Sequence, residues 1–201
     1  NGYELCKTIK EDIAISHIPV ILLTAKDDKQ SLISGYKNGA DGYLSKPFEV
    51  EMLMELIRNR LKNREYTKKR YLNAGLIPTP EESTISLTDE TFLIKLNSII
   101  QENIDNTNLG IQFICQEVGL GRSSLYNKLK ALTGMGANEY ISKLRIEKAI
   151  TLISGTDMPF SEIAEKTGFT TPSYFSTTFK QYTGETPSQY KERKKKGLTD
   201  Q

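Results

Sequence analysis

Hydrophobic and polar positions recur with helical spacing through the second half of the chain, most clearly across residues 160–190. Ile163 lies on the apolar stripe of a first helix, and Gly168 is placed to end that helix in a left-handed conformation. Thr171 followed by Pro172 is a typical helix start, with a hydroxyl N-cap and a proline at the first helical position. The stretch therefore predicts two helices joined by a tight turn.

The second of these helices separates apolar from small polar side chains. Phe175 and Phe179 lie four residues apart and share the predicted buried face. Gly184 ends the helix, and Tyr190 on a last short helix is expected to pack against the pair. The polar side chains that project away are Ser173, Ser176, Thr177 and Lys180. Such a pair of helices suits insertion into the major groove of DNA.

The same pattern occurs earlier in the chain. Ile114 lies 49 residues before Ile163, and Leu125 lies 50 residues before Phe175, so the second copy has one extra turn residue. The copies are two helix-turn-helix units. The apolar spacing over residues 139–153 predicts one connecting helix, which separates the units by roughly 20 Å at 1.5 Å per residue. Successive major-groove faces lie about 34 Å apart, so one chain could offer a helix to each.

The first 62 residues follow a different pattern. Residues 19–25 form a continuous apolar run of strand length, as in a parallel sheet covered on both faces, and Gly42–Ser45 is a second short strand. Helices are predicted over residues 2–11, 28–38 and 47–62. The order of helices and strands is that of half of a doubly wound α/β unit.

A basic segment and a linker separate the two patterns. Residues 58–70 carry seven positive charges against one negative charge, which favours a solvated helix extension over a contact to the DNA backbone. Residues 73–87, rich in Gly, Pro, Ser and Thr, are a predicted linker. Thr88 and Asp89 are expected to cap the next helix. The apolar stripe of that helix should brace the first helix-turn-helix; it comprises Phe92, Leu96, Ile99, Ile100 and Ile104.

Composition narrows the choice of chemistry. The chain has 201 residues, 37% of them hydrophobic, and a formal net charge of +2, so charge alone does not indicate nucleic acid. Its one histidine, His17, and its two cysteines, Cys6 and Cys115, make no recognisable zinc site or nucleophilic triad. No apolar run reaches 18 residues and no signal peptide opens the chain. We expect a soluble, cytoplasmic segment with reduced thiols, no catalytic residues, no metal and no cofactor.

The residues of the second half resemble the AraC/XylS-type DNA-binding domain of bacterial transcription regulators, from about residue 89 to residue 193. The resemblance is carried by Arg145, Ala149, Ile163, Ala164, Gly168, Phe169, Ser173, Tyr174, Phe175, Phe179, Lys180, Gly184, Pro187 and Tyr190. It implies that the recognition helix of the first unit spans residues 122–132, after a turn at residues 119–121.

This resemblance assigns candidate contacts to double-stranded DNA. The base-reading positions fall on Ser123, Tyr126, Asn127, Pro172, Ser173 and Thr177. Asn127 is the best candidate because an amide pairs bidentately with adenine, whereas Pro172 has no donor and Thr177 stands where the family often has arginine. Candidate phosphate contacts are Arg122, Lys128, Lys130, Lys143 and Lys180, each with solvated surface charge as the alternative. Tyr174, Phe175 and Phe179 are interpreted as core rather than stacking residues.

The first 62 residues resemble the carboxy-terminal part of a two-component receiver domain. The resemblance is carried by residues 1–4, 19–25, 39–43 and 46–48. It implies that Thr24 contacts the phosphoryl group, that Lys46 is its ammonium partner and that Tyr43 is the aromatic switch residue. The acceptor aspartate and the Mg²⁺-binding acidic pair of an intact receiver would lie before Asn1. We therefore expect no response of this chain to phosphodonors.

The predicted fold class is mixed: a truncated, flavodoxin-like α/β receiver segment followed by an all-α domain with two helix-turn-helix units. The predicted divisions are 1–62 (receiver part), 63–88 (basic helix extension and linker), 89–193 (DNA-binding domain) and 194–201 (basic, polar tail). Because two strands cannot complete a covered sheet, we expect residues 1–62 to be loosely ordered or to self-associate.

The predicted function is sequence-specific DNA binding at the output end of a two-component phosphorelay, with RNA polymerase as a further candidate partner and no membrane contact by this segment. Two alternatives remain open. In the first, the chain resembles the tail of a hybrid sensor histidine kinase of the Bacteroides type, so that the parent protein is an enzyme anchored in the inner membrane. In the second, the chain is a helical interaction module that does not bind DNA.

Overall fold

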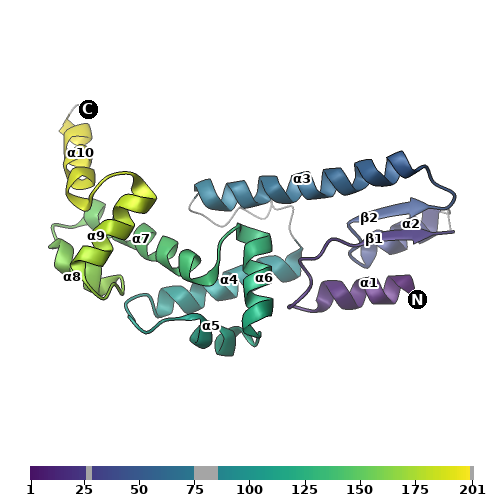
Figure 1. Cartoon of the computed structure of the whole chain (residues 1–201), viewed down its shortest axis with the longest axis horizontal. Helices are drawn as coiled ribbons and strands as arrows, with labels where there is room; N and C mark the ends of the chain where they lie inside the picture. The colour runs from purple at the N-terminus through teal and green to yellow at the C-terminus, as the bar shows by residue number, and fades with distance from the viewer. Residues whose placement is uncertain (26–28, 75–85, 200–201) are drawn as a thin grey trace. The chain divides into compact units, whose positions relative to one another are not determined.

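The computed structural model describes residues 1–25, 29–74 and 86–199 of the chain (Figure 1). The described residues form two compact units. The first unit comprises Asn1–Lys95 with Val118–Met135, and the second comprises Leu96–Glu117 with Gly136–Gln201. The mixed fold class predicted from the sequence is confirmed, since a small parallel sheet with its helices precedes a wholly helical region.

The first unit contains the α/β segment. Its elements are α1 (Gly2–Glu11), β1 (Ile21–Thr24), α2 (Lys29–Lys37), β2 (Gly42–Ser45) and α3 (Val50–Ala74). The two strands pair in parallel, with Ile21 opposite Gly42 and Thr24 opposite Ser45. Asn1 begins α1 through a capping box with Glu4, in which each side chain satisfies a backbone N–H of the other residue.

Helix α3 is longer than the sequence prediction, which ended it near residue 62. It continues to Ala74 and so includes the whole basic run of residues 58–70, confirming that run as a helix extension. The first residue after Pro47 that strongly disfavours a helix is Gly75, and nothing before it breaks the pattern. The predicted linker lies mostly outside the described residues.

The sheet of the first unit is only partly covered. Leu23 on β1 is exposed, and no residue of β1 is fully buried. Other large apolar side chains of this segment also face solvent: Leu5, Ile18, Leu32, Ile33, Tyr36, Val50, Met52, Met54 and Leu61. The unpaired sheet edges and these side chains agree with the expected incompleteness of a two-stranded sheet.

Seven helices follow. They are α4 (Leu87–Glu102), α5 (Ile111–Val118), α6 (Arg122–Thr133), α7 (Ala137–Gly155), α8 (Phe160–Lys166), α9 (Pro172–Thr183) and α10 (Pro187–Thr199). The predicted cap of α4 at Thr88 and Asp89 is wrong, since the helix begins two residues earlier. Ser86 Oγ accepts the backbone N–H of Asp89 at 3.2 Å, while Thr88 Oγ1 donates to the carbonyl of Lys10. Ile104 lies beyond the end of α4 and is half-buried.

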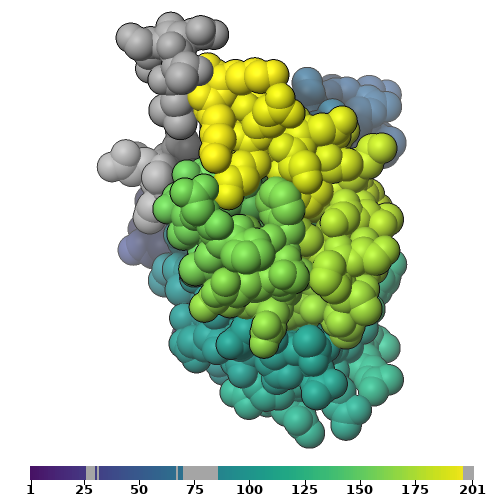
Figure 2. Space-filling view, turned by 90° about the vertical axis from the view of Figure 1, so that its left-hand side faces the viewer, coloured from purple at the N-terminus to yellow at the C-terminus, as the bar shows by residue number. Residues whose placement is uncertain are grey.

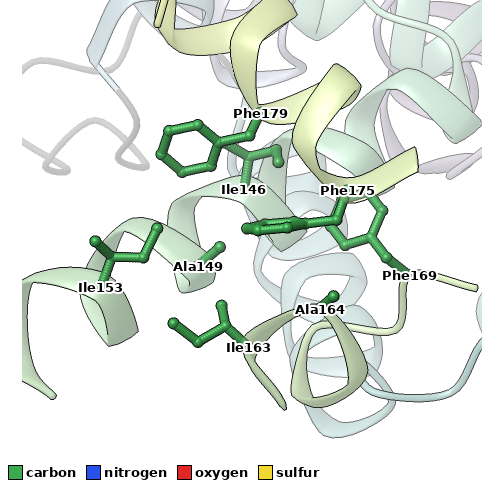
Figure 3. Close-up of a cluster of buried hydrophobic side chains, with 8 residues drawn as sticks. All are labelled: Ile146, Ala149, Ile153, Ile163, Ala164, Phe169, Phe175 and Phe179. Atoms are coloured by element: carbon green, nitrogen blue, oxygen red, sulfur yellow. The ribbon is translucent and has the colours of Figure 1, made fainter. Parts of the chain in front are cut away.

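An aromatic and aliphatic cluster forms the core of the second unit (Figure 3). Phe175 lies in edge contact with Phe179, and Phe179 with Tyr190 of α10, with ring centroids 5.7 and 5.6 Å apart. The packing of Tyr190 predicted from the sequence is therefore confirmed. The other buried members of the cluster are Ile146, Ala149 and Ile153 of α7, Ile163 and Ala164 of α8, and Phe169 of the turn.

The cysteines are free thiols, as predicted. Cys6 is fully buried, and burial raises the pKa of its thiol. Cys115 is only half-buried.

Candidate nucleic-acid interface

The turn between α8 and α9 is fixed by backbone geometry. Gly168 has a φ of +71°, and a β-carbon at this position would lie 2.3 Å from the carbonyl oxygen of Ile104. Only glycine can therefore occupy the position without displacing that backbone. Thr171 then begins α9, because its hydroxyl accepts the backbone N–H of Tyr174 at 3.1 Å and Pro172 occupies the first turn. Both helix signals predicted from the sequence are confirmed.

Arg145 holds this turn in place from the middle of α7. It is buried, and its Nη2 donates to the carbonyl of Asn106 at 2.7 Å. Its guanidinium carbon lies 5.9 Å from the centre of the Phe169 ring, next to Gly168. Burial lowers the pKa of Arg145. Arg145 is one of the residues that carry the family resemblance, but the sequence alone assigned it no role. In the structure, Arg145 positions the turn that precedes α9.

The outer face of α9 is polar and exposed. Pro172, Ser173, Thr177 and Lys180 are exposed, while Phe175 and Phe179 lie beneath them in the core. The hydroxyl of Thr177 donates to the carbonyl of Ser173 at 3.1 Å, so its oxygen remains an acceptor at the surface. Figure 2 shows the side of the molecule on which α7, α8 and α9 form one continuous surface, coloured from green to yellow-green.

Tyr174 corrects one interpretation from the sequence. It is 52% exposed, although its ring touches the edge of Phe169 at a centroid distance of 5.7 Å. On a helix, the residue before Phe175 points about 100° away from it, which places Tyr174 at the margin of the apolar face. The prediction that Tyr174 is a core residue was wrong, whereas Phe175 and Phe179 are buried as predicted.

Helix α6 also has distinct buried and exposed faces. Leu125, Leu129 and Leu132 are buried, and Gly134 ends the helix in the left-handed conformation with a φ of +78°. Five predicted contact residues lie exposed: Arg122, Ser123, Tyr126, Asn127 and Lys130. Helix α3 packs against α6 but leaves these side chains accessible.

Lys128 is not available for a phosphate contact, and this prediction was wrong. Its side chain is 0% exposed and forms an ion pair with Asp89 at the start of α4. Its ammonium also donates to Ser16 Oγ at 2.7 Å, and Ser16 Oγ donates to Asp89 Oδ1 at 2.7 Å. The ring of Phe92 lies 5.0 Å away. Burial lowers the pKa of Lys128, against the hydrogen bond and charge of Asp89, which raise it.

Lys143 is a weaker phosphate candidate than its charge suggested. Its side chain is largely buried, and its ammonium lies 3.8 Å from Glu147 Oε1 in the next turn of α7. Burial lowers the pKa of Lys143 and raises that of Glu147. Arg122, Lys130 and Lys180 are the predicted cations that the structure leaves exposed.

The receiver-like residues lie at one edge of the sheet. Thr24 ends β1 and Lys46 directly follows β2, and the backbone N–H of Lys46 donates to the carbonyl of Thr24 at 2.6 Å. Tyr43 on β2 is half-buried against α2. Its ring lies so close to Gly35 of α2 that a β-carbon on Gly35 would be only 2.9 Å from it. Thr24 and Lys46 are thus together at the carboxyl ends of parallel strands, where such sheets bind anions.

Within the parts of the chain that the structure describes, no group of three or more His, Cys, Asp and Glu side chains could hold a metal ion. None of the described helices has the length and apolar character needed to cross a bilayer.

Comparison with known proteins assigns the two regions. Residues 114–193 match the family model described as a helix-turn-helix domain, and residues 1–58 match that of the response regulator receiver domain. An AraC-type transcriptional regulator from Chromobacterium violaceum has a similar fold, with a TM-score of 0.50 at 24% identity. That alignment covers 54% of this chain and 96% of the other.

Two curated relatives align with parts of this chain. Histidine kinase P4 of Formosa agariphila is 42% identical over 192 residues, which are 96% of this chain and 14% of the kinase. The transcriptional regulatory protein YesN of Bacillus subtilis is 33% identical over 119 residues, 58% of this chain and 32% of that protein. This chain spans only a small part of either relative. Residues 1–58 therefore correspond to a response regulator receiver region and residues 114–193 to a helix-turn-helix domain.

Proposed function

We propose that this chain is the DNA-binding output end of a two-component regulator, and that α6 and α9 are the helices that enter the major groove. The observation that carries the proposal is the same in both helices. Each has an apolar face in a core and an opposite face on which predicted base-contact side chains are exposed. A short polar helix face presented in this way matches the depth and width of the major groove.

The two helices have different roles in this proposal. Asn127 of α6 is the principal base reader, because its exposed amide supplies a donor and an acceptor to adenine. Ser123 and Tyr126 flank it on the same face. In α9, Ser173 and Thr177 offer only hydroxyl groups, so α9 contributes more to placement on the duplex than to base reading.

The proposed phosphate contacts are the exposed cations Arg122, Lys130 and Lys180. They lie beside the proposed reading faces, where a cation meets the phosphates that line a groove. Each such contact releases condensed counterions from DNA, so affinity should fall steeply as salt rises.

We also propose that the parent of this chain is a hybrid sensor histidine kinase. The alignment with Histidine kinase P4 runs through both regions at 42% identity, which supports a common arrangement of receiver and DNA-binding parts. In such a protein, phosphoryl transfer to the receiver would control the output domain, in the cytoplasm. Translating the reading frame upstream of Asn1 tests this proposal, since a kinase parent must contain an ATP-binding domain and a phosphorylatable histidine there.

Selection of bound fragments from genomic DNA, followed by salt titration of one selected duplex, tests DNA binding. The expected result is a dissociation constant at least a thousandfold lower for the selected duplex than for a scrambled one, with a linear fall of log affinity against log salt. Equal, salt-independent binding of both duplexes would favour the alternative of a helical interaction module, for which the net charge of +2 is the supporting observation.

Two protein partners complete the proposal. Self-association through residues 1–62 is supported by the exposed apolar side chains and open sheet edges of that segment. Sedimentation of the chain over a concentration series measures it, and a monomer at all concentrations would refute it. Contact with RNA polymerase rests on the regulatory role alone and is tested by transcription from a promoter that carries the selected site.

A further inference from the structure

A cavity of about 290 Å³ lies within the first unit, beside helices α3 and α6. Arg60 and Arg64 reach it from α3, and Ala131 lines it from α6. Its remaining charged and titratable lining consists of Lys10, His17, Asp41 and Asp89. None of the predicted DNA-contact residues lines this cavity, and neither DNA binding nor the receiver residues account for it.

The charges around the cavity do not balance. Lys10 forms an ion pair with Asp41 at 2.6 Å, and Asp89 is paired with the buried Lys128. Arg60 and Arg64 are half-buried, and neither makes an ion pair or a hydrogen bond with any residue that the structure describes. They are four residues apart on one helix face, where like charges repel each other. Among the residues that the structure describes, no ion pair therefore holds either guanidinium group in the cavity.

His17 adds an unsatisfied polar atom to the same cavity. Its Nδ1 is buried and has no hydrogen-bond partner among the residues that the structure describes. Burial lowers the pKa of His17, and the charge of Lys128 lowers it further, which favours the neutral imidazole. A neutral imidazole either accepts or donates one hydrogen bond at Nδ1. A buried polar atom without a partner calls for a water molecule or a ligand.

We propose that this cavity is a binding site for a small phosphate-bearing anion, held by Arg60 and Arg64 with His17 as a third contact. The planar guanidinium groups match phosphate oxygens bidentately, and two of them neutralise a dianion. The volume accommodates a phosphate group with a few carbon atoms attached, close to the lower limit of ordinary ligand pockets. Because Ala131 belongs to α6, an occupant also touches the first recognition helix.

Inorganic phosphate is the probe for this site. Isothermal titration of the 201-residue chain with phosphate, at constant ionic strength set with chloride, should give saturable binding of one phosphate per chain. The double variant Arg60→Gln/Arg64→Gln removes both unpaired cations and should weaken phosphate binding about tenfold or more, since a hydrogen bond to a charged group contributes at least one factor of ten.

The double variant Arg58→Gln/Lys62→Gln is the matched control. It removes the same charge at the same spacing from the same helix, at exposed positions outside the cavity. Its phosphate affinity should stay within about twofold of the unmodified chain, because exposed charges at this distance are screened. A third variant, Ala131→Met, keeps every charge but fills the cavity and should also abolish binding.

Three results would overturn the proposal. One is equal weakening by the two double variants, which would mean a general charge effect. Another is unchanged phosphate binding in Ala131→Met with the melting temperature preserved. The third is loss of duplex DNA affinity in Arg60→Gln/Arg64→Gln without loss of phosphate binding, which would assign these arginines to the DNA backbone. None of these results bears on base reading by α6 and α9.

Discussion

Replacing Asp89 with leucine removes the carboxylate that pairs with Lys128 in the interior of the first unit. The change leaves a lysine that is 0% exposed, whose ammonium keeps Ser16 Oγ as its one hydrogen-bond partner among the residues that the structure describes. Breaking a buried ion pair from one side costs about 3–5 kcal/mol, because the remaining charge keeps its desolvation penalty and loses its compensation. We expect Asp89→Leu to lower the free energy of unfolding by about this amount.

The double variant Asp89→Leu/Lys128→Met separates the cost of an unpaired charge from the value of the pair. Methionine keeps the length of the lysine side chain, and the Phe92 ring 5.0 Å away provides an apolar neighbour. Replacing both partners of a buried pair by apolar residues is often neutral or stabilising. The double variant should therefore recover most of the stability lost in Asp89→Leu, a coupling of about 2–4 kcal/mol.

Urea unfolding followed by far-ultraviolet circular dichroism measures these differences, and the exposed Lys130→Met is the control, with an expected change below about 0.5 kcal/mol. A loss below about 1 kcal/mol in Asp89→Leu would show that Lys128 reaches water or another anion. A double variant no more stable than Asp89→Leu would show that leucine at position 89 disturbs the packing by itself. Either result would refute the account of the buried pair.

Three other changes test separate parts of the molecule. Asn127→Ala should weaken binding of the selected duplex by about 1–3 kcal/mol and relax the preference at one base pair. Lys180→Ala should weaken binding of all duplexes alike and lower the slope of log affinity against log salt by about one. If Asn127→Ala loses equal affinity for the selected and scrambled duplexes, Asn127 is not a base reader. Gly168→Ala should destabilise the chain by about 2 kcal/mol or more, because the new β-carbon would sit on a left-handed backbone, 2.3 Å from the carbonyl oxygen of Ile104. The control Gly155→Ala, in open space within α7, should not destabilise the chain. Similar shifts of the melting temperature in the two variants would contradict this explanation. The pKa of His17 is below the unfolded value of 6.5, so the unfolded chain takes up this proton first as the pH falls. Stability should therefore fall as the pH drops below about 6.5 and level off once the folded-state pKa is passed. In urea titrations His17→Gln should show a smaller loss of stability between pH 7 and pH 5, and an identical loss would be evidence against a buried neutral imidazole.

Local signals in the sequence were sufficient for the second helix-turn-helix. The positive φ of Gly168, the hydroxyl cap of Thr171 and the burial of Phe175 follow from single residues and helical spacing. The end of α3 also follows from the sequence, since no glycine or proline interrupts it from Phe48 to Ala74. The sequence predicted a helix to about residue 62 with the basic run of residues 58–70 as its extension, and in the structure the two are one helix.

Long-range pairing is what the sequence did not reveal. Lys128 lies three residues after Leu125 and four before Leu132, so helical spacing alone places it on the buried stripe of α6. Lysine is almost never fully buried without a partner, and its partner Asp89 is 39 residues away on another helix. Nothing in the local pattern connects the two. The cavity was likewise recognisable only from the fold, which brings together Arg60, Arg64 and the Nδ1 of His17, none of them hydrogen-bonded to a residue that the structure describes.

Helices α6 and α9 are held by different kinds of contact. Aromatic and aliphatic packing around Phe175 and Phe179 buries the inner face of α9, and the turn at Gly168 sets where that helix begins. The ammonium of Lys128 must stay within hydrogen-bond reach of Asp89 and Ser16, because a buried charge without partners is far more costly than a lost apolar contact. A rotation of α6 by one residue, about 100°, would break the ion pair and expose Leu125 together. The buried pair therefore fixes which side of α6 faces outward, and with it the direction in which Asn127 is presented.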